Sequence, residues 1–253
     1  MSGVRWSHAH GIGRLTLDHP PVNILTRALL AECRAILAEA ATTPSVRVLL
    51  LDAAGPHFSA GADVAEHLPG AWEAMIPEFL ATVAQMDAFP TPIVAAVQGK
   101  CLGGGFEFIL PADLIIAADD AAFGQPEIVL GVMPPAACAL LPDHLPAQAA
   151  AAMVFTGDPM SALEALRLGL AHRVVPRPEL SQAATSLAER MARHSGAALR
   201  AAKAALKGDR TADRKRRLDR AGERYASEVM TTRDAVEGLT AFLAKRRPTW
   251  SHA

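Results

Sequence analysis

The spacing of apolar and polar residues predicts strands that alternate with helices over roughly the first two thirds of the chain. The segment that begins at Gly11 alternates and then breaks at the prolines 20 and 21, which predicts a hairpin-like start of a sheet. Apolar residues recur at helical spacing behind a cap at Thr26 and again over residues 72–86. Near-continuous apolar runs, typical of parallel strands buried on both faces, occupy residues 46–52, 93–97 and 114–118. This order predicts an α/β fold, with a largely parallel sheet or stacked sheets and an active site where strands end.

The C-terminal part of the chain has a different pattern. From Gln182 onward the sequence is charged and helix-prone, with no β-branched run long enough for a strand. The segment from Thr231 to Asp234 is a T-x-x-D capping signal for a last helix. We therefore assign residues 1–180 to an α/β core and residues 181–253 to a helical C-terminal region of one functional domain.

Two loops that follow apolar strands carry glycines, HFSAGAD at 57–63 and QGKCLGGGFE at 98–107. Glycine lets the backbone approach a ligand closely and leaves peptide N–H groups free to face a ligand oxygen. Two such N–H groups from separate strand ends would form an oxyanion hole. The alternative is that the glycines only make a tight turn, and neither loop matches a nucleotide-phosphate motif.

Glu107 and Glu127 are isolated carboxylates in apolar surroundings. Glu107 lies between two phenylalanines behind the glycine turn, and burial there would raise its pKa toward a range useful for acid–base work. Glu127 follows a proline near the next strand end. Each could instead be a solvent-facing residue, Glu107 in the first turn of a helix and Glu127 at an edge. Together they favour a site in which one carboxyl group removes a proton and the other delivers one.

Composition excludes several classes of protein. The 253 residues are 51% hydrophobic and carry 25 Lys and Arg against 26 Asp and Glu, so a large core is expected and a global attraction to nucleic acid or anionic membranes is not. No stretch is long enough for a membrane span, and the N-terminus has no apolar segment of a secretory signal. Three cysteines in apolar surroundings, without a CxxC pair, indicate a reducing, cytoplasmic setting.

Other candidate chemistry is weaker. The nine histidines show no metal-ligand spacing, so no metal site is expected, and Ser59 lacks the nucleophile-elbow motif. The basic run over residues 210–220 is punctuated by aspartates and predicts a solvated helix face, with Asp213 paired to Arg217; a phosphate-bearing ligand or RNA is the alternative.

At these motifs the chain resembles the crotonase, or enoyl-CoA hydratase/isomerase, superfamily. The resemblance covers nearly the whole length through PPVNILT, FSAGAD, QGKCLGGGFE, FGQPEIVLG and EGLTAFLAKRRP. It implies a spiral of ββα units with a helical C-terminal trimerisation region, homotrimers or hexamers, an acyl-CoA thioester as substrate, and no separate cofactor.

The resemblance also implies roles for individual residues. The N–H groups of Ala60 and Gly104 would hold the thioester oxygen, and Glu107 and Glu127 would be the catalytic pair. Residues implied to bind CoA or substrate are Ala60, Gly61, Ala62, Asp63, Gly104, Phe242 and Lys245. Tyr225, the only tyrosine, receives no role.

One departure from the superfamily pattern concerns Pro135, which stands where a glycine N–H helps to position water and has no N–H itself. Together with GPHFSAGA, EHLP and GKCLGGG, this segment is similar to cyclohexa-1,5-diene-1-carbonyl-CoA hydratases. The predicted function is hydration of an α,β-unsaturated, cyclic dienoyl-CoA. The alternatives are an enoyl-CoA isomerase, a short-chain enoyl-CoA hydratase, or a CoA- or RNA-binding paralogue.

Overall fold

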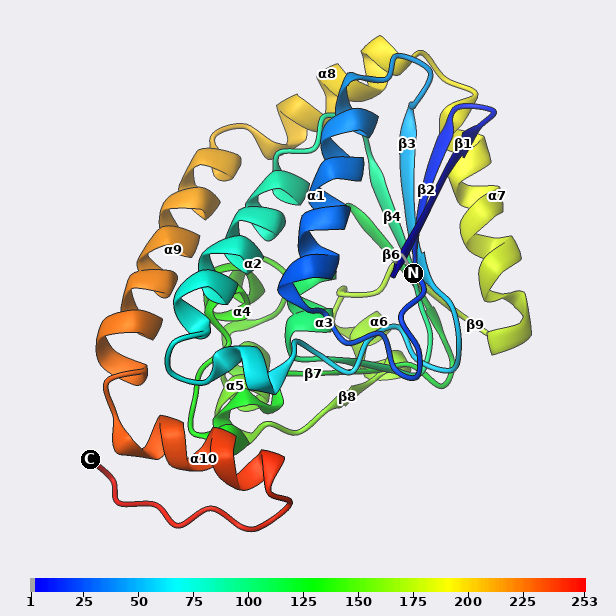
Figure 1. Cartoon of the computed structure of the whole chain (residues 1–253). Coiled ribbons are helices and arrows are strands. Elements are labelled where there is room, and N and C mark those ends of the chain that lie inside the picture. Colours follow the sequence, from blue (N-terminus) through cyan, green and yellow to red (C-terminus); the bar gives the residue numbers. More distant parts are fainter. Residues whose placement is uncertain (1–2) are drawn as a thin grey trace.

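The computed structural model describes residues 3–253, which build a six-stranded sheet in the order β1-β2-β3-β4-β6-β9 (Figure 1). Its strands are β1 (Val4–Ala9), β2 (Ile12–Leu17), β3 (Val48–Ala53), β4 (Ile93–Val97), β6 (Leu114–Ala118) and β9 (Arg173–Val175). A hairpin does begin the sheet, since β1 and β2 pair antiparallel, but its turn is at His10 and Gly11, and its first strand precedes the segment in which the hairpin was predicted. All later pairings in this sheet are parallel, as the apolar runs predicted.

Helices cover both faces of this sheet, which explains why its central strands are apolar throughout. Leu49 and Leu51 of β3 face the core beneath α1 (Arg27–Thr42) and α2 (Trp72–Asp87). Val48 and Leu50 point to the opposite face, where α7 (Leu180–Ala192) packs across the sheet (Figure 1). The predicted cap of α1 is confirmed: the Thr26 side chain accepts a hydrogen bond from the Leu29 N–H at 3.2 Å.

A second, three-stranded sheet lies within the predicted core, and its strands were not predicted. It has the order β5-β7-β8, with β5 (Lys100–Leu102), β7 (Ala122–Gly124) and β8 (Met160–Ser161). β5 falls inside the glycine-containing segment that the sequence pattern indicated as a loop. Strands this short carry too few residues to show a period of two.

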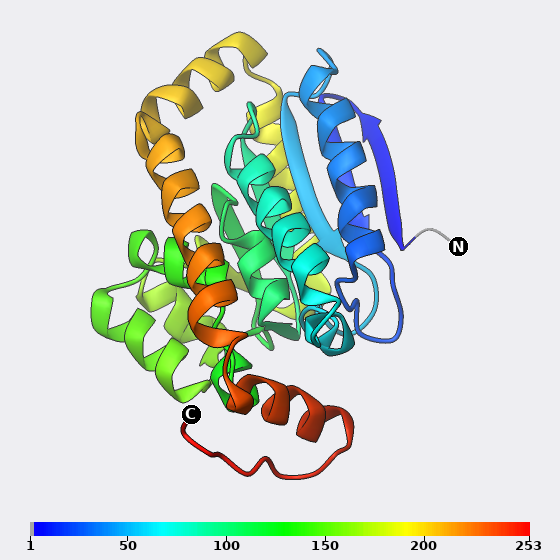
Figure 2. The ribbon, with the colours of Figure 1, turned by 60° about the vertical axis from the view of Figure 1, so that its left-hand side comes forward.

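Four of the remaining helices lie between strands, and three follow the last strand. They are α3 (Gly104–Ile109), α4 (Pro135–Leu140), α5 (Ala147–Thr156), α6 (Ala162–Arg167), α8 (Gly196–Lys207), α9 (Arg210–Arg224) and α10 (Arg233–Leu243). Short turns are η1 (Val64–His67), η2 (Pro126–Leu130), η3 (Leu141–Asp143), η4 (Arg177–Glu179) and the π-helical η5 (Tyr225–Val229). Figure 2 shows α9 running down into η5 and α10, and α9 packs against α2 and α4. Within residues 3–253, no helix has the length and apolarity needed to cross a bilayer.

Three local expectations need correction. The cap of α10 is Thr232, one residue beyond Thr231, and its side chain accepts from the Ala235 N–H at 3.2 Å. Cys138 is exposed, because the short α4 turns it outward while its neighbours are buried. Arg214, inside the basic run, is buried, although the predicted pair between Asp213 and Arg217 is confirmed at 2.9 Å.

Candidate active site

The glycine turn between β5 and α3 brings two chain segments close together. Gly103 has φ +50°, a conformation that favours glycine, and its N–H donates to the Gly124 carbonyl at 2.8 Å. A side chain at this position would collide with the Glu127 carboxylate. At Gly105, a Cβ atom would lie 2.5 Å from the Ser59 Cβ. The turn therefore does more than reverse the chain, since its close packing brings the start of α3 against Ser59 of the first predicted loop and against Glu127 of η2.

The Ala60 N–H cannot serve as an oxyanion donor, which corrects the assignment made from the sequence. It donates to the Val22 carbonyl oxygen at 2.9 Å. Ala62 is better placed. It forms a parallel β-bridge with Leu25, in which the Leu25 N–H donates to the Gly61 carbonyl oxygen and the Asp63 N–H donates to the Leu25 carbonyl oxygen. The Ala62 N–H takes no part in this bridge and points away from Leu25.

Gly104 lies directly opposite Ala62. A Cβ atom built on Gly104 would lie 3.1 Å from the Ala62 backbone nitrogen, and both residues line the same small cavity. The Gly104 N–H belongs to the first turn of α3, where a helix supplies no acceptor of its own. The backbones of Ala62 and Gly104, from separate loops, therefore lie close together at this cavity, and their N–H groups are the candidates for an oxyanion hole.

Glu107 belongs to α3, and its buried carboxylate meets the N-terminus of α4. Its side chain is 3% exposed, and Oε1 accepts a hydrogen bond from the Ala137 N–H at 2.8 Å. Burial raises the pKa of Glu107 to about 7, although backbone hydrogen bonds from Ala137 and Ala136 oppose the rise. The alternative of a solvent-facing glutamate is wrong.

Glu127 approaches the same cavity from η2. The buried Gln125 side chain lies against this carboxylate. Its amide nitrogen, in the orientation that faces Glu127, donates a hydrogen bond to Glu127 Oε2 at 2.9 Å. Burial and the charge of Glu107 raise the pKa of Glu127 well above its ordinary value. The charge of each carboxyl group opposes ionisation of the other, so the pair loses its protons less readily than two isolated glutamates would.

The cavity has a narrow inner part and a wider outer part. The inner chamber has a volume of about 20 Å³, and both glutamates, Ala62 and Gly104 line it. The outer part has a volume of about 400 Å³ and shares Ala62 and Glu127 with the chamber. Its walls are mostly apolar and include Phe242 of α10. An elongated ligand with an apolar stem would reach the carboxylates through this outer part.

Two further polar side chains line the inner chamber, and sequence reasoning missed both. Tyr225 is 1% exposed and begins the π-helical turn η5. His67 ends η1, and its Nδ1 lies 2.7 Å from the Asp63 carbonyl oxygen. Burial lowers the pKa of His67, so the ring is neutral at pH 7 and Nδ1–H donates to that carbonyl. The only signal for Tyr225 was its being the sole tyrosine, and His67 lies in the EHLP segment.

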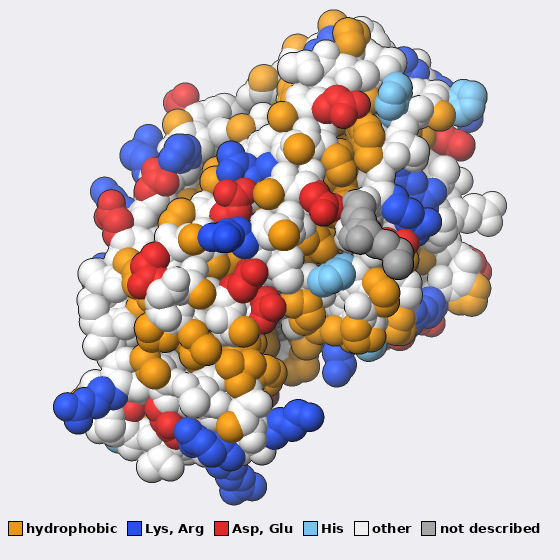
Figure 3. All heavy atoms as spheres, in the orientation of Figure 1, with side chains coloured by type: hydrophobic (Ala, Val, Ile, Leu, Met, Phe, Trp, Pro, Cys, Tyr) orange, Lys and Arg blue, Asp and Glu red, His pale blue; other side chains and the backbone are white. Residues whose placement is uncertain are grey.

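The mouth of the outer cavity lies against α10. Figure 3 shows hydrophobic side chains gathered above α10 and Lys and Arg side chains around it. Phe242 is 55% exposed there, and Lys245 is exposed just beyond the helix. Asp63 takes another role, because its side chain caps η1 by accepting from the Ala65 N–H at 2.9 Å.

Backbone contacts join α10 to η2. At Gly238 an added Cβ atom would collide with the Leu130 carbonyl oxygen, and at Gly131 it would lie 2.7 Å from the Asp234 carbonyl oxygen. The helix at the mouth is therefore packed directly onto the turn that carries Glu127.

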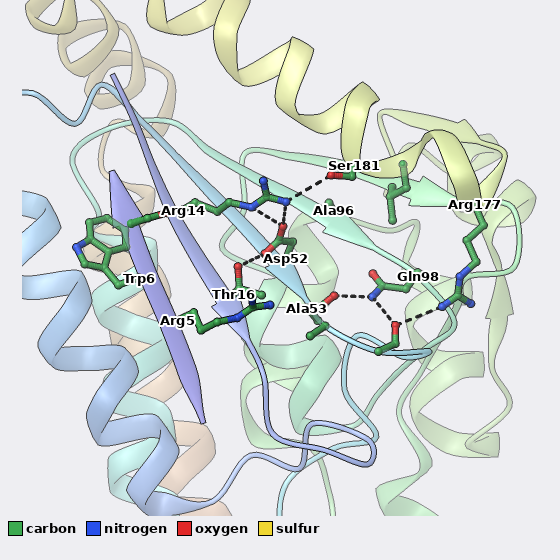
Figure 4. A pocket seen from close by; sticks show the side chains of 14 residues that line it. Arg5, Trp6, Arg14, Thr16, Asp52, Ala53, Ala96, Gln98, Arg177 and Ser181 are labelled. Atoms are coloured by element: carbon green, nitrogen blue, oxygen red, sulfur yellow. Dashed lines mark hydrogen bonds and ion pairs between the residues drawn. The ribbon is translucent and has the colours of Figure 1, made fainter. Parts of the chain in front are cut away.

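A larger cavity, of about 710 Å³, lies beside the start of α7 (Figure 4). Its charged groups are already engaged: Arg14 pairs with Asp52, and Arg177 donates to the Pro56 carbonyl oxygen at 2.8 Å. Gln98 likewise donates to the Ala53 carbonyl oxygen at 2.7 Å. This pocket brings together none of the residues predicted for catalysis.

Comparisons with known proteins agree with the geometry of the smaller site. Residues 7–253 match the family model described as enoyl-CoA hydratase/isomerase. The chain is 41% identical over 239 residues to cyclohexa-1,5-dienecarbonyl-CoA hydratase of Thauera aromatica, covering 94% of this chain and 92% of that protein. It is 35% identical over 245 residues to carnitinyl-CoA dehydratase of Escherichia coli strain K12, covering 93% of each. The crystal structure of carnitinyl-CoA hydratase from Mycobacterium avium superposes with a TM-score of 0.90 at 30% identity and covers 100% of both chains.

Proposed function

The chain belongs to the enoyl-CoA hydratase/isomerase family and is a hydro-lyase of the enoyl-CoA hydratase type, and on that premise we propose that it hydrates a cyclic, conjugated dienoyl-CoA. The predicted crotonase-type fold is confirmed by the solved structures. Support for the cyclic substrate comes from the 41% identity to the Thauera aromatica enzyme. The Pro135 segment, which departs from typical hydratases, points the same way.

The observation that carries the proposal is that two carboxyl groups without a Lys or Arg partner in the inner chamber lie beside the backbone N–H groups of Ala62 and Gly104. In the proposed mechanism, the N–H groups of Ala62 and Gly104 bind the thioester oxygen and stabilise the negative charge that develops on it. Backbone donors in a fixed turn need no reorganisation as that charge appears.

The proton transfers follow from the environments of the two carboxyl groups. Glu107, held ionised in part by backbone N–H groups, removes a proton from water as the water oxygen bonds to the β-carbon. The electron pair of the double bond moves onto the thioester oxygen as a dienolate. Glu127, the group with the stronger tendency to stay protonated, returns a proton to carbon. The sum is addition of one water across the conjugated system.

The CoA portion of the bound thioester would extend from the chamber along the outer cavity to the surface. Phe242 and the exposed Lys245 lie at its mouth and at the end of α10, where an apolar pantetheine arm and anionic phosphates need such contacts. Assembly as a homotrimer or hexamer is part of the proposal, supported by large apolar side chains on the surface such as Phe155, Leu163 and Leu206. A cytoplasmic setting fits the three free cysteines.

A panel of linear enoyl-CoA and cyclic dienoyl-CoA thioesters tests the substrate assignment. We expect the highest kcat/KM for a cyclic dienoyl-CoA and a product heavier by one water in the mass spectrum. A higher kcat/KM for linear enoyl-CoA thioesters would indicate an ordinary short-chain hydratase. A shifted double bond without any gain in mass would indicate an isomerase.

A further inference from the structure

The hydroxyl group of Tyr225 is a buried polar atom that no other group satisfies. The side chain is 1% exposed, and among residues 3–253 the oxygen has no hydrogen-bond partner. A buried hydroxyl without a partner destabilises the folded state, because it has lost its hydrogen bonds to water and gained none in return. The oxygen bonds to neither glutamate, although Tyr225, Glu107 and Glu127 line the same chamber. Such a group is expected where a ligand supplies the missing partner.

The fold fixes the direction of this phenol. Its ring lies between the rings of His67 and Trp72, with centroids 6.4 and 6.2 Å away. Ile76 and Met230 belong to the same apolar cluster. Tyr225 also begins the π-helical turn, in which the Met230 N–H donates to the Tyr225 carbonyl at 2.9 Å. Turns of this kind occur frequently at functional sites. The hydroxyl cannot leave the chamber without disrupting this packing.

The phenol is a proton donor under all ordinary conditions. Burial, and then the negative charges of Glu107 and Glu127, hold the pKa of Tyr225 above its ordinary value. The group therefore keeps its proton and can donate a hydrogen bond to an oxygen in the chamber.

The size of the chamber indicates which oxygen this is. About 20 Å³ accommodates roughly one water molecule, which needs two to four polar partners. The two carboxyl groups can accept both water hydrogens, but a donor for the water oxygen is also required. Pro135 lines the chamber without an N–H, and the Ala137 N–H is already bonded to Glu107.

We propose that the Tyr225 hydroxyl donates a hydrogen bond to the oxygen of the reacting water and positions it for addition. This inference rests on the proposed hydratase function. One lone pair of the water accepts from Tyr225, and the other forms the bond to the β-carbon while a water proton passes to Glu107. Tyr225 keeps its own proton throughout. In the reverse reaction the same hydrogen bond stabilises the departing hydroxide, so Tyr225 is a positioning residue in both directions.

The test is Tyr225→Phe, which removes only the hydroxyl oxygen and its hydrogen. We expect kcat for hydration to fall about 10- to 100-fold, less than for loss of an oxyanion-hole donor because Tyr225 only positions the water, with KM for the acyl-CoA within about twofold. The thermal midpoint of the free protein should not fall, because the unpaired buried hydroxyl is gone. Unchanged kcat, or a lowered midpoint with kcat changed in proportion to the folded fraction, would overturn the inference.

A second readout separates water positioning from general damage to the site. Exchange of the α-hydrogen of a saturated acyl-CoA with deuterated solvent needs the N–H pair and a carboxyl group but no added water. We expect Tyr225→Phe to retain this exchange at the wild-type rate. Equal loss of exchange and hydration would contradict the proposed role.

Met230→Leu is the matched packing control, since Met230 shares the apolar cluster with Tyr225 but does not line the chamber. It should retain kcat, and an equal loss in this variant would assign the effect to packing and overturn the inference. If the wild-type enzyme hydrates no member of the thioester panel, the proposed function itself fails. If it does hydrate one and Tyr225→Phe matches it, only the role of Tyr225 fails.

Discussion

The protein buries carboxylates in two regions and neutralises them in different ways. In the chamber, Glu107 and Glu127 approach each other, and among the described residues no Lys or Arg lines that cavity. Between α2 and α9, Asp87 is 2% exposed but lies 2.8 Å from the Arg214 guanidinium and 2.9 Å from the Lys207 ammonium.

The difference shows how one fold separates reactivity from stability. Beside the same arginine, hydrogen bonds from Arg217 and Arg214 lower the pKa of Asp143 although burial opposes them. In the chamber, which no Lys or Arg of the described residues lines, a buried carboxylate can be neutralised only by a proton, and burial raises the pKa of Glu107 to about 7. A carboxyl group that can gain or lose its proton near neutral pH is suited to catalysis, whereas a paired one holds helices together.

The largest expected effect concerns activity in the chamber. Glu107→Gln and Glu127→Gln, made singly, should each lower kcat about 10²- to 10⁴-fold, because an amide can neither accept nor deliver the proton. Circular dichroism should show an unchanged fold. Glu78→Gln on α2, where the carboxylate pairs with Arg34 at the surface, should retain wild-type kcat. Near-normal turnover in both chamber variants would show that the unpaired glutamates are no more important for catalysis than the cation-paired carboxylates.

The next effect concerns stability at the paired cluster. Arg214→Met should lower the free energy of unfolding by about 3–5 kcal/mol in urea titrations, because it leaves Asp87 buried with a weakened ion pair. Turnover per folded molecule should remain near wild type. Arg216→Met removes an exposed pair with Asp213 and should change the unfolding free energy by about 1 kcal/mol or less. Equal losses in the two variants would show that burial does not distinguish these arginines.

A smaller effect is the dependence of stability on pH. Glu107 has a raised pKa in the folded protein, so the folded state binds a proton that the unfolded state has already released between about pH 4.5 and 7. The free energy of unfolding should therefore decrease as pH rises through this window, by about 3 kcal/mol from this group. Glu107→Gln should flatten that decrease in urea titrations at several pH values. If the unfolding free energy of Glu107→Gln fell with pH as steeply as that of the wild-type protein, the raised pKa would belong to another group.

The sequence predicted the parts of the fold that depend on a long local pattern. Buried parallel strands such as Val48–Ala53 need many consecutive apolar residues, and the two glutamates stand out because isolated charges are costly in such surroundings. Backbone hydrogen bonding, in contrast, is decided by distant partners. The Ala60 N–H is consumed by Val22, and no feature within FSAGAD distinguishes it from the Ala62 N–H.

Burial of single polar side chains also depends on tertiary packing. Arg214 looked like its exposed neighbours, but α9 turns it toward Asp87 and Asp143. The sole tyrosine was assigned no function, because only the meeting of η5 with η1 and α2 places its ring against His67 and Trp72.

The close contacts at Gly131 and Gly238 have a consequence for how such an enzyme can diverge. They join the turn that carries Glu127 to the helix that carries Phe242, with no space for a side chain between the two backbones. Substitutions in α10 that change the shape of the entrance would therefore also shift Glu127, the proposed proton donor. Selection for a new acyl-CoA would therefore act on the entrance and on the position of Glu127 together.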